Sequence, residues 1–176
     1  MPYQSTWPAC FEVEAQRLSQ TLGPALTGRT EHIGSTAVPG LAAKPTIDIL
    51  LEVPSLEIAE RDIVPLLEEG GYVCMWTRSA SDGHIMCVRG YGSEGFVPGE
   101  QVVHVHLAPP GHVLWERLLF RDYLRAHPDE AQRYADLKRE LAIEHREDRE
   151  AYTEGKTAFV VERTERERRR REAEPR

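Results

Sequence analysis

The sequence lacks the features that mark secreted, membrane-spanning and nucleic-acid-binding proteins. Its three cysteines form no Cys-x-x-Cys pair and no disulfide framework, which favours a reducing compartment. It shows no basic start followed by an apolar stretch, and no run approaches the ~20 apolar residues of a membrane span. The net charge of −7 leaves no general basic surface for the phosphates of a nucleic acid. We therefore expect a cytoplasmic protein with no membrane partner and no nucleic acid partner.

The composition is that of an ordinary globular protein. A chain of 176 residues, 40% hydrophobic and 29% charged, can build one domain with a substantial core and is too short for two comfortable ones. Residues 162–176 consist mainly of Arg and Glu and have no apolar face. We expect a single domain over residues 1–161 and a charged, frayed helical tail over residues 162–176. The sequence carries no prediction of the oligomeric state.

Hydrophobic patterns predict an α/β fold in which a sheet-forming half precedes a helical half. The expected strands cover residues 29–33, 47–53, 72–77, 84–89 and 101–107. Helices are expected over residues 7–22 and throughout the chain after Gly111. Another helix should start at Ser55 and run to about Glu69, with an interruption at Pro65, because proline cannot donate the helical hydrogen bond.

The expected strands over residues 72–77 and 84–89 form a hairpin. The turn-forming residues Ser81, Asp82 and Gly83 lie between them. Cys74 and Cys87 fall in the two apolar runs, and we expect both to be small buried core residues that are not joined by a disulfide.

A glycine-containing loop and an acidic strand carry the strongest indication of chemistry. Gly34 and Ser35 follow a strand, and such a turn offers backbone N–H groups and a hydroxyl to phosphate oxygens. Asp48 lies inside an apolar strand, where a carboxylate is costly unless it is paired, hydrogen-bonded or bound to a metal. Together they suggest a phosphate-binding loop beside a metal-binding strand. The alternative is a tight turn with a strand-edge aspartate, and the spacing alone favours this alternative.

His104 and His106 alternate along a later strand and therefore share one face. Two imidazoles on one face can hold a transition metal, and a set of Asp48, His104 and His106 would prefer zinc, manganese or iron to magnesium. The alternative is that both imidazoles hydrogen-bond to neighbouring groups or bind an anion.

The run from Glu31 to Leu50, Glu-His-Ile-Gly-Ser-Thr-Ala-Val-Pro-Gly-Leu-Ala-Ala-Lys-Pro-Thr-Ile-Asp-Ile-Leu, resembles the signature of the GrpB family. Shorter matches occur at residues 104–107 and 120–128, and the resemblance covers roughly residues 7 to 160. That family is grouped with the nucleotidyltransferases of the polymerase-β type, which implies a mixed, twisted sheet backed by helices. The family has no well-established reaction, and some members are fused to dephospho-coenzyme A kinase.

The sequence departs from an active nucleotidyltransferase at one position. Such enzymes place two acids at positions i and i+2 of one strand, ~6.6 Å apart along it, so that they share metal ions. Asp48 is present, but Leu50 occupies the second position. Glu52 shares the face but lies ~13 Å along the strand from Asp48, which is too far to replace the missing ligand.

Cationic residues near the expected loop could offset phosphate charge. Arg121 lies in a family-like stretch of a helix and is the expected phosphate contact. Lys44 precedes Pro45 close to the loop and could neutralise a phosphate. Lys138 and Lys156 could do so too, although ordinary surface lysines are commoner.

The resemblance implies a nucleotidyltransferase-like protein that acts on or binds a nucleotide or another small phosphorylated molecule with the help of Mg, Mn or Zn. Asp48 would be the catalytic metal ligand. The loop residues Gly34, Ser35 and Thr36 would hold phosphates, assisted by Lys44 and Arg121. One alternative is a non-catalytic module that binds a nucleotide or a coenzyme A-like ligand. A second alternative is a transition-metal site built on His104 and His106.

Overall fold

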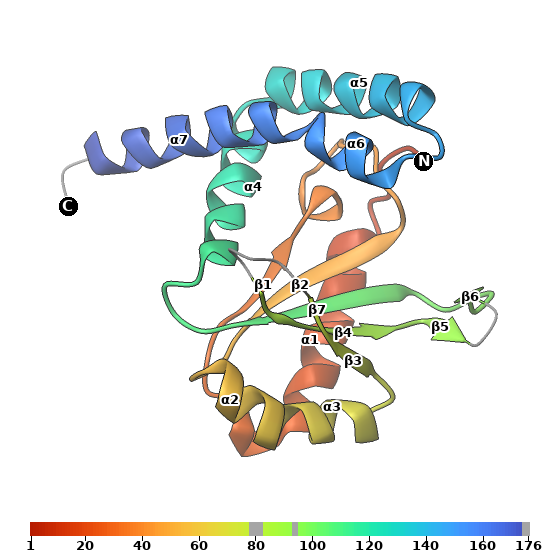
Figure 1. Cartoon of the computed structure of the whole chain (residues 1–176), viewed down its shortest axis with the longest axis vertical. Coiled ribbons are helices and arrows are strands. Elements are labelled where there is room, and N and C mark those ends of the chain that lie inside the picture. Colours follow the sequence, from red (N-terminus) through yellow and green to blue (C-terminus); the bar gives the residue numbers. More distant parts are fainter. Residues whose placement is uncertain (78–82, 93–94, 174–176) are drawn as a thin grey trace.

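The computed structural model describes residues 1–77, 83–92 and 95–173. Within these ranges, five strands form one mixed sheet in the order β1-β2-β7-β4-β3 (Figure 1). Their bounds are Thr30–Ile33 (β1), Thr46–Glu52 (β2), Val73–Trp76 (β3), Ile85–Arg89 (β4) and Val102–Ala108 (β7). β2 and β7 are parallel, and the other neighbouring pairs are antiparallel. A two-stranded ribbon of Tyr91–Gly92 (β5) and Gly95–Phe96 (β6) follows β4. The mixed sheet expected from the sequence is confirmed.

The two central strands, β2 and β7, determine where the polar residues of the sheet lie. Their register places Asp48 beside His104 and Leu50 beside His106. Because side chains alternate along a strand, these four side chains share one face of the sheet. The residues of β2 on the opposite face are all fully buried: Ile47, Ile49 and Leu51.

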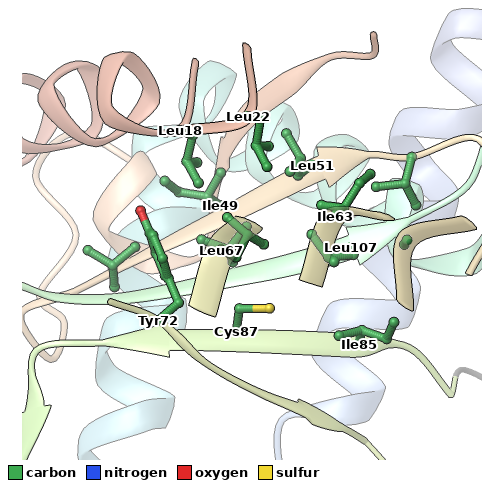
Figure 2. Close-up of a cluster of buried hydrophobic side chains, with 14 of the residues drawn as sticks. Leu18, Leu22, Ile49, Leu51, Ile63, Leu67, Tyr72, Ile85, Cys87 and Leu107 are labelled. Carbon is green, nitrogen blue, oxygen red and sulfur yellow. The ribbon is translucent and has the colours of Figure 1, made fainter. Parts of the chain in front are cut away.

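One helical layer covers the face opposite Asp48. It consists of Trp7–Leu22 (α1), Leu56–Ile58 (α2), the π-helical turn Ala59–Ile63 (η3) and Val64–Glu69 (α3). The Ser55 hydroxyl accepts a hydrogen bond from the Ile58 amide, as expected for an N-cap, and the helix is irregular just before Pro65. Figure 2 shows the core between this layer and the sheet, where apolar side chains of both point toward one another: Leu18, Leu22, Ile49, Leu51, Ile63, Leu67 and Leu107.

A second helical layer covers part of the face that carries Asp48. It contains Val113–Glu116 (η4), Arg117–Ala126 (α4), Pro128–Glu144 (α5), Arg149–Glu154 (α6) and Thr157–Ala173 (α7), and α5, α6 and α7 group together on one side of the sheet (Figure 1). Its core joins these helices to the loop after β1 through apolar residues: Val38, Leu41, Leu124, Tyr134 and Phe159. Among the helices in the described ranges, none is both long and apolar enough to cross a membrane.

The boundary expected after residue 161 falls inside α7, which continues to Ala173. Several side chains of its charged half contact the other helices. Arg171 pairs with Asp122 of α4 at 2.6 Å, and Arg168 pairs with Glu116 at 2.8 Å. The side chain of Glu167, in the same half of α7, is buried. Residues 162–173 are therefore part of the second helical layer.

The hairpin of β3 and β4 forms as expected, but the expectation for its cysteines is wrong. Cys74 lies directly opposite Cys87 in the register of the two strands, with a Cα–Cα distance of 3.9 Å, and a disulfide joins them. The sequence could not show this because it does not determine which residues face each other across the hairpin. Of the expected turn, Ser81 and Asp82 lie outside the described residues.

Candidate functional site

The loop after β1 is held against Asp48 by a glycine. Gly34 has a φ of +74°, and a Cβ atom at this position would lie 2.5 Å from Asp48 Oδ2. Both observations require glycine, the first because left-handed backbone is strained in other residues and the second because no side chain fits. Ser35 follows Gly34 and begins the 3-10 turn Ser35–Ala37 (η2).

Asp48 lies between two imidazoles of β7. Its Oδ1 atom is 3.4 Å from His104 Nδ1 and 3.8 Å from His106 Nε2. Burial opposes ionisation of Asp48, but the two imidazoles outweigh it and lower its pKa to about 2. Asp48 is thus a carboxylate at neutral pH, and its side chain remains 28% exposed.

The imidazoles continue into a chain of polar contacts across the sheet. His106 Nδ1 lies 2.9 Å from His84 Nε2, and His84 Nδ1 lies 2.9 Å from the hydroxyl of Thr77. His104 Nε2 lies 3.2 Å from the hydroxyl of Tyr91. Burial lowers the pKa of His106, against the opposing effect of Asp48. The structure therefore unites both histidines with Asp48 and gives each imidazole a second partner.

The carboxylates needed for a pair of magnesium ions are not assembled here. Leu50, at the position of the second acid, is fully buried and packs with Ile33, Ala108 and Leu114. Glu52 lies at the end of β2 and pairs with Arg29 at 2.9 Å. Within the described part of the chain, no group of three or more His, Cys, Asp or Glu side chains is arranged to hold a metal ion.

A cavity of about 490 Å³ lies between the loop, the strand ends and helices α5 and α6. The chain has three lysines, and all of them line this cavity together with Ser35 and Asp48: Lys44, Lys138 and Lys156. We call it the cationic cavity. Lys44 was expected near the loop, whereas Lys138 and Lys156 come from α5 and from the segment between α6 and α7.

Lys138 connects α5 to both ends of the loop. Its ammonium group donates to Ser35 Oγ at 3.0 Å and to the Ala42 carbonyl at 2.7 Å. It also lies 5.0 Å from the centre of the Tyr134 ring. Burial and the nearby charge of Lys156 lower the pKa of Lys138 to about 8. Two like charges face one space, which is the arrangement that an anion would stabilise.

A second cavity of about 530 Å³ adjoins the first. Six residues line both cavities: Ser35, Asp48, His104, Tyr134, Thr153 and Lys156. Most of its wall is apolar and comes from the loop, α4 and α7: Val38, Leu41, Phe120, Leu124, Val160 and Val161. We call it the apolar cavity. Met86, His106 and Arg117 also line it.

Arg121, the expected phosphate contact, lines the apolar cavity, and its guanidinium group is bonded to other parts of the protein. Its guanidinium donates to Glu31 at 2.8 Å, to the His32 carbonyl at 2.9 Å and to Asp122 at 2.7 Å. The charge is balanced by two carboxylates, so Arg121 fastens α4 to β1. Thr36 has a structural contact as well, because its hydroxyl donates a hydrogen bond to the Thr46 carbonyl at the start of β2.

Known proteins resemble this chain over most of its length. The family model described as GrpB protein matches residues 1–166. A UPF0157 protein of Pseudomonas aeruginosa is 42% identical over 163 residues, which cover 92% of this chain and 64% of that protein. A UPF0157 protein of Bacillus subtilis is 39% identical, and the match covers 90% of this chain and 43% of that protein. The chain thus spans less than two thirds of the length of either relative.

Solved structures agree with these matches. The crystal structure of GrpB from Enterococcus faecalis has a TM-score of 0.77, 34% identity and 95% coverage of both chains. The Cid1 poly(U) polymerase, in a structure titled as Mg 3′-dATP bound, has a TM-score of 0.54 and 15% identity, and the match covers 88% of this chain and 49% of that one. The second likeness shows the fold alone. The chain therefore belongs to the GrpB family, and its fold is nucleotidyltransferase-like.

Proposed function

We propose that the cationic cavity binds the phosphate groups of a nucleotide or of a related small molecule such as a coenzyme A precursor. The observation that carries this proposal is the position of the lysines. In a chain with a net charge of −7, all three lysines line one cavity beside Ser35. Holding ammonium groups together in a partly buried space is unfavourable without an anion, and phosphate oxygens accept hydrogen bonds from both ammonium and hydroxyl groups.

The geometry of Lys138 supports a phosphate ligand. An ammonium group has three N–H donors, and the contacts with Ser35 and Ala42 use two of them. A ligand phosphate beside Ser35 would therefore meet the lysine and the hydroxyl together. The fold likeness to Cid1, whose structure was solved with a nucleotide bound, favours the nucleotide class.

Binding is the function we propose, because the residues do not fit the metal pair of a nucleotidyltransferase. A pair of Mg²⁺ ions needs carboxylates at positions 48 and 50, and Leu50 is apolar and buried. We therefore derive no transfer step. The cytoplasmic location expected from the sequence suits a nucleotide ligand.

The test is calorimetric titration of the purified chain with tripolyphosphate and with ATP. Lys138→Gln should weaken tripolyphosphate binding by about tenfold or more, because a charged hydrogen bond is lost. Arg146→Gln is the matched control: Arg146 is exposed, lines neither cavity, and its loss changes the net charge equally. An equal loss in both variants, or no binding to the unmodified chain, would contradict the proposal.

A second set of titrations examines metal ions and turnover. Binding is measured with Mg²⁺, Mn²⁺ and Zn²⁺, each with the unmodified chain and with Asp48→Asn. Pyrophosphate release from ATP is measured in parallel. The binding function predicts no release. Pyrophosphate release by the unmodified chain that is lost in Asp48→Asn would show a nucleotidyl transfer activity instead of binding alone. Zinc binding that depends only on His104 and His106 would favour the transition-metal alternative.

A further inference from the structure

We propose that the apolar cavity is a separate subsite for a second small molecule, one with an aliphatic body and a hydrogen-bond-donating head. This subsite is distinct from the phosphate subsite, and only the joint use of the two rests on the proposed function. Its volume of about 530 Å³ lies within the range of small-molecule sites, roughly 300–1,000 Å³.

The wall of the apolar cavity favours an aliphatic occupant. Val38 and Leu41 of the loop and Leu124 of α4 are buried and belong to the core of the second helical layer. Val161 and Thr157, at the start of α7, line the cavity and are exposed, so we place its entrance there. A CH₂ chain lying along this wall would remove apolar surface from water on both sides, which is the main driving force for such binding.

A nucleobase suits this cavity less well. The two aromatic side chains of its wall already pack with each other and with Phe159: Phe120 lies 5.1 Å from Tyr134 and 6.4 Å from Phe159, and Tyr134 lies 5.3 Å from Phe159, between ring centres. Arg121 is engaged by Glu31 and Asp122. Both aromatic rings of the wall are thus already engaged with aromatic neighbours, which disfavours the stacking of a base on them.

The head of the ligand is indicated by the junction of the two cavities. The Asp48 carboxylate lines both cavities there, and its side chain is 28% exposed. A carboxylate accepts hydrogen bonds, so it favours a head that donates one. Lys156 also lines both cavities, and a hydroxyl can accept from its ammonium group while it donates to Asp48. The same junction borders the phosphate subsite at Ser35. The head of the aliphatic molecule would thus lie next to the phosphates of the first ligand.

The test uses straight-chain alkan-1-ols of four to eight carbons, titrated against the full chain. Each added CH₂ should lower the Kd by about fourfold until the cavity is filled. A fatty acid of equal length should bind more weakly than the alcohol, because its carboxylate cannot donate a hydrogen bond to Asp48. A Kd that does not change with chain length, or a preference for the acid, would overturn the proposal.

Two variants close the entrance without touching the core. Val161→Trp and Thr157→Trp should each abolish alkanol binding, since both positions line the entrance. The control is Ile143→Trp, at an exposed position of α5 that lines neither cavity. The melting temperature of each variant verifies its folding. Unchanged alkanol binding in both entrance variants would overturn the proposal, whatever the result for phosphate.

Competition separates this inference from the proposed function. Saturating tripolyphosphate or ATP should change the Kd of the alkanol by less than about twofold if the subsites are separate. Competition by ATP but not by tripolyphosphate would overturn the inference by assigning the apolar cavity to the base. Alkanol binding without any phosphate binding would leave the subsite established and contradict only the proposed function.

Discussion

Gly34 shows how one residue positions the site. Its φ of +74° and the 2.5 Å approach of a virtual Cβ to Asp48 Oδ2 both exclude a side chain. Gly40 has a similar φ of +79° but nothing within 4 Å of its virtual Cβ. Comparing alanine at the two positions therefore separates backbone strain from the contact with Asp48.

Gly40→Ala should lower the free energy of unfolding by about 1 kcal/mol, the cost of left-handed backbone in a residue with a side chain. Gly34→Ala should cost about 1 kcal/mol more, because Asp48 must move away from His104 and His106. Urea denaturation of both variants measures the difference. In an Asp48→Ala background the difference should shrink without vanishing, because the Cβ atom of residue 48 lies 3.2 Å from the Cβ built at Gly34. A difference of unchanged size would show that the Asp48 carboxylate is not the cause.

Lys138 gives the site a pH dependence. Its pKa of about 8 means that the ammonium form, which attracts phosphate, is lost as the pH rises through 8. Tripolyphosphate affinity should therefore fall by about tenfold between pH 7 and pH 9, relative to Lys138→Arg, whose charge persists. The Arg variant experiences the same ionisation of the phosphate, so it is the proper reference. A constant ratio of the two affinities would contradict the role given to Lys138.

The site residues that could be predicted from the sequence are those whose relative positions follow from the regular geometry of one strand. Asp48, His104 and His106 could be aligned because strand side chains alternate with a period of two. Lys138 and Lys156 could be named only as possible phosphate contacts, because their positions in the cationic cavity depend on how α5 and α6 return over the loop. Arg121 lies near the site, but its partner Glu31 is 90 residues away in sequence, and this pairing could not be predicted.

Among the elements, the β3–β4 hairpin combines a correct prediction with a wrong one. Alternating and apolar runs predicted both strands, while the pairing of Cys74 with Cys87 depends on register. The bridge closes a loop with a sequence separation of 13. Reduction, or replacement of both residues by Ser, should lower the free energy of unfolding by about 3 kcal/mol, since the unfolded chain regains entropy.

Denaturant titration with and without a reductant measures this loss. A thiol count provides the control, because the oxidised protein should show one free thiol, that of Cys10, and the reduced protein three. Three reactive thiols in the unfolded, unreduced protein would contradict the disulfide.

At the scale of the whole molecule, two helical layers enclose one sheet (Figure 1). The residues that line the two cavities come from the sheet, the loop after β1 and the second layer. The fold class could be predicted from the order of strands and helices and from the resemblance of residues 31–50 to the GrpB family. The cavities could not be predicted, because each is lined by segments from both halves of the chain. The net charge of −7 thus gave no indication that all three lysines line one cavity.

The central claim, that this place binds phosphate, can be tested by NMR of protein in which only the lysine side chains carry ¹³C. The chain gives three such lysines, and all of them line the cationic cavity. Addition of tripolyphosphate should shift all three ε-methylene signals along one saturable binding curve. Signals that stay unmoved, or that move only in proportion to added salt, would contradict a phosphate site in this cavity.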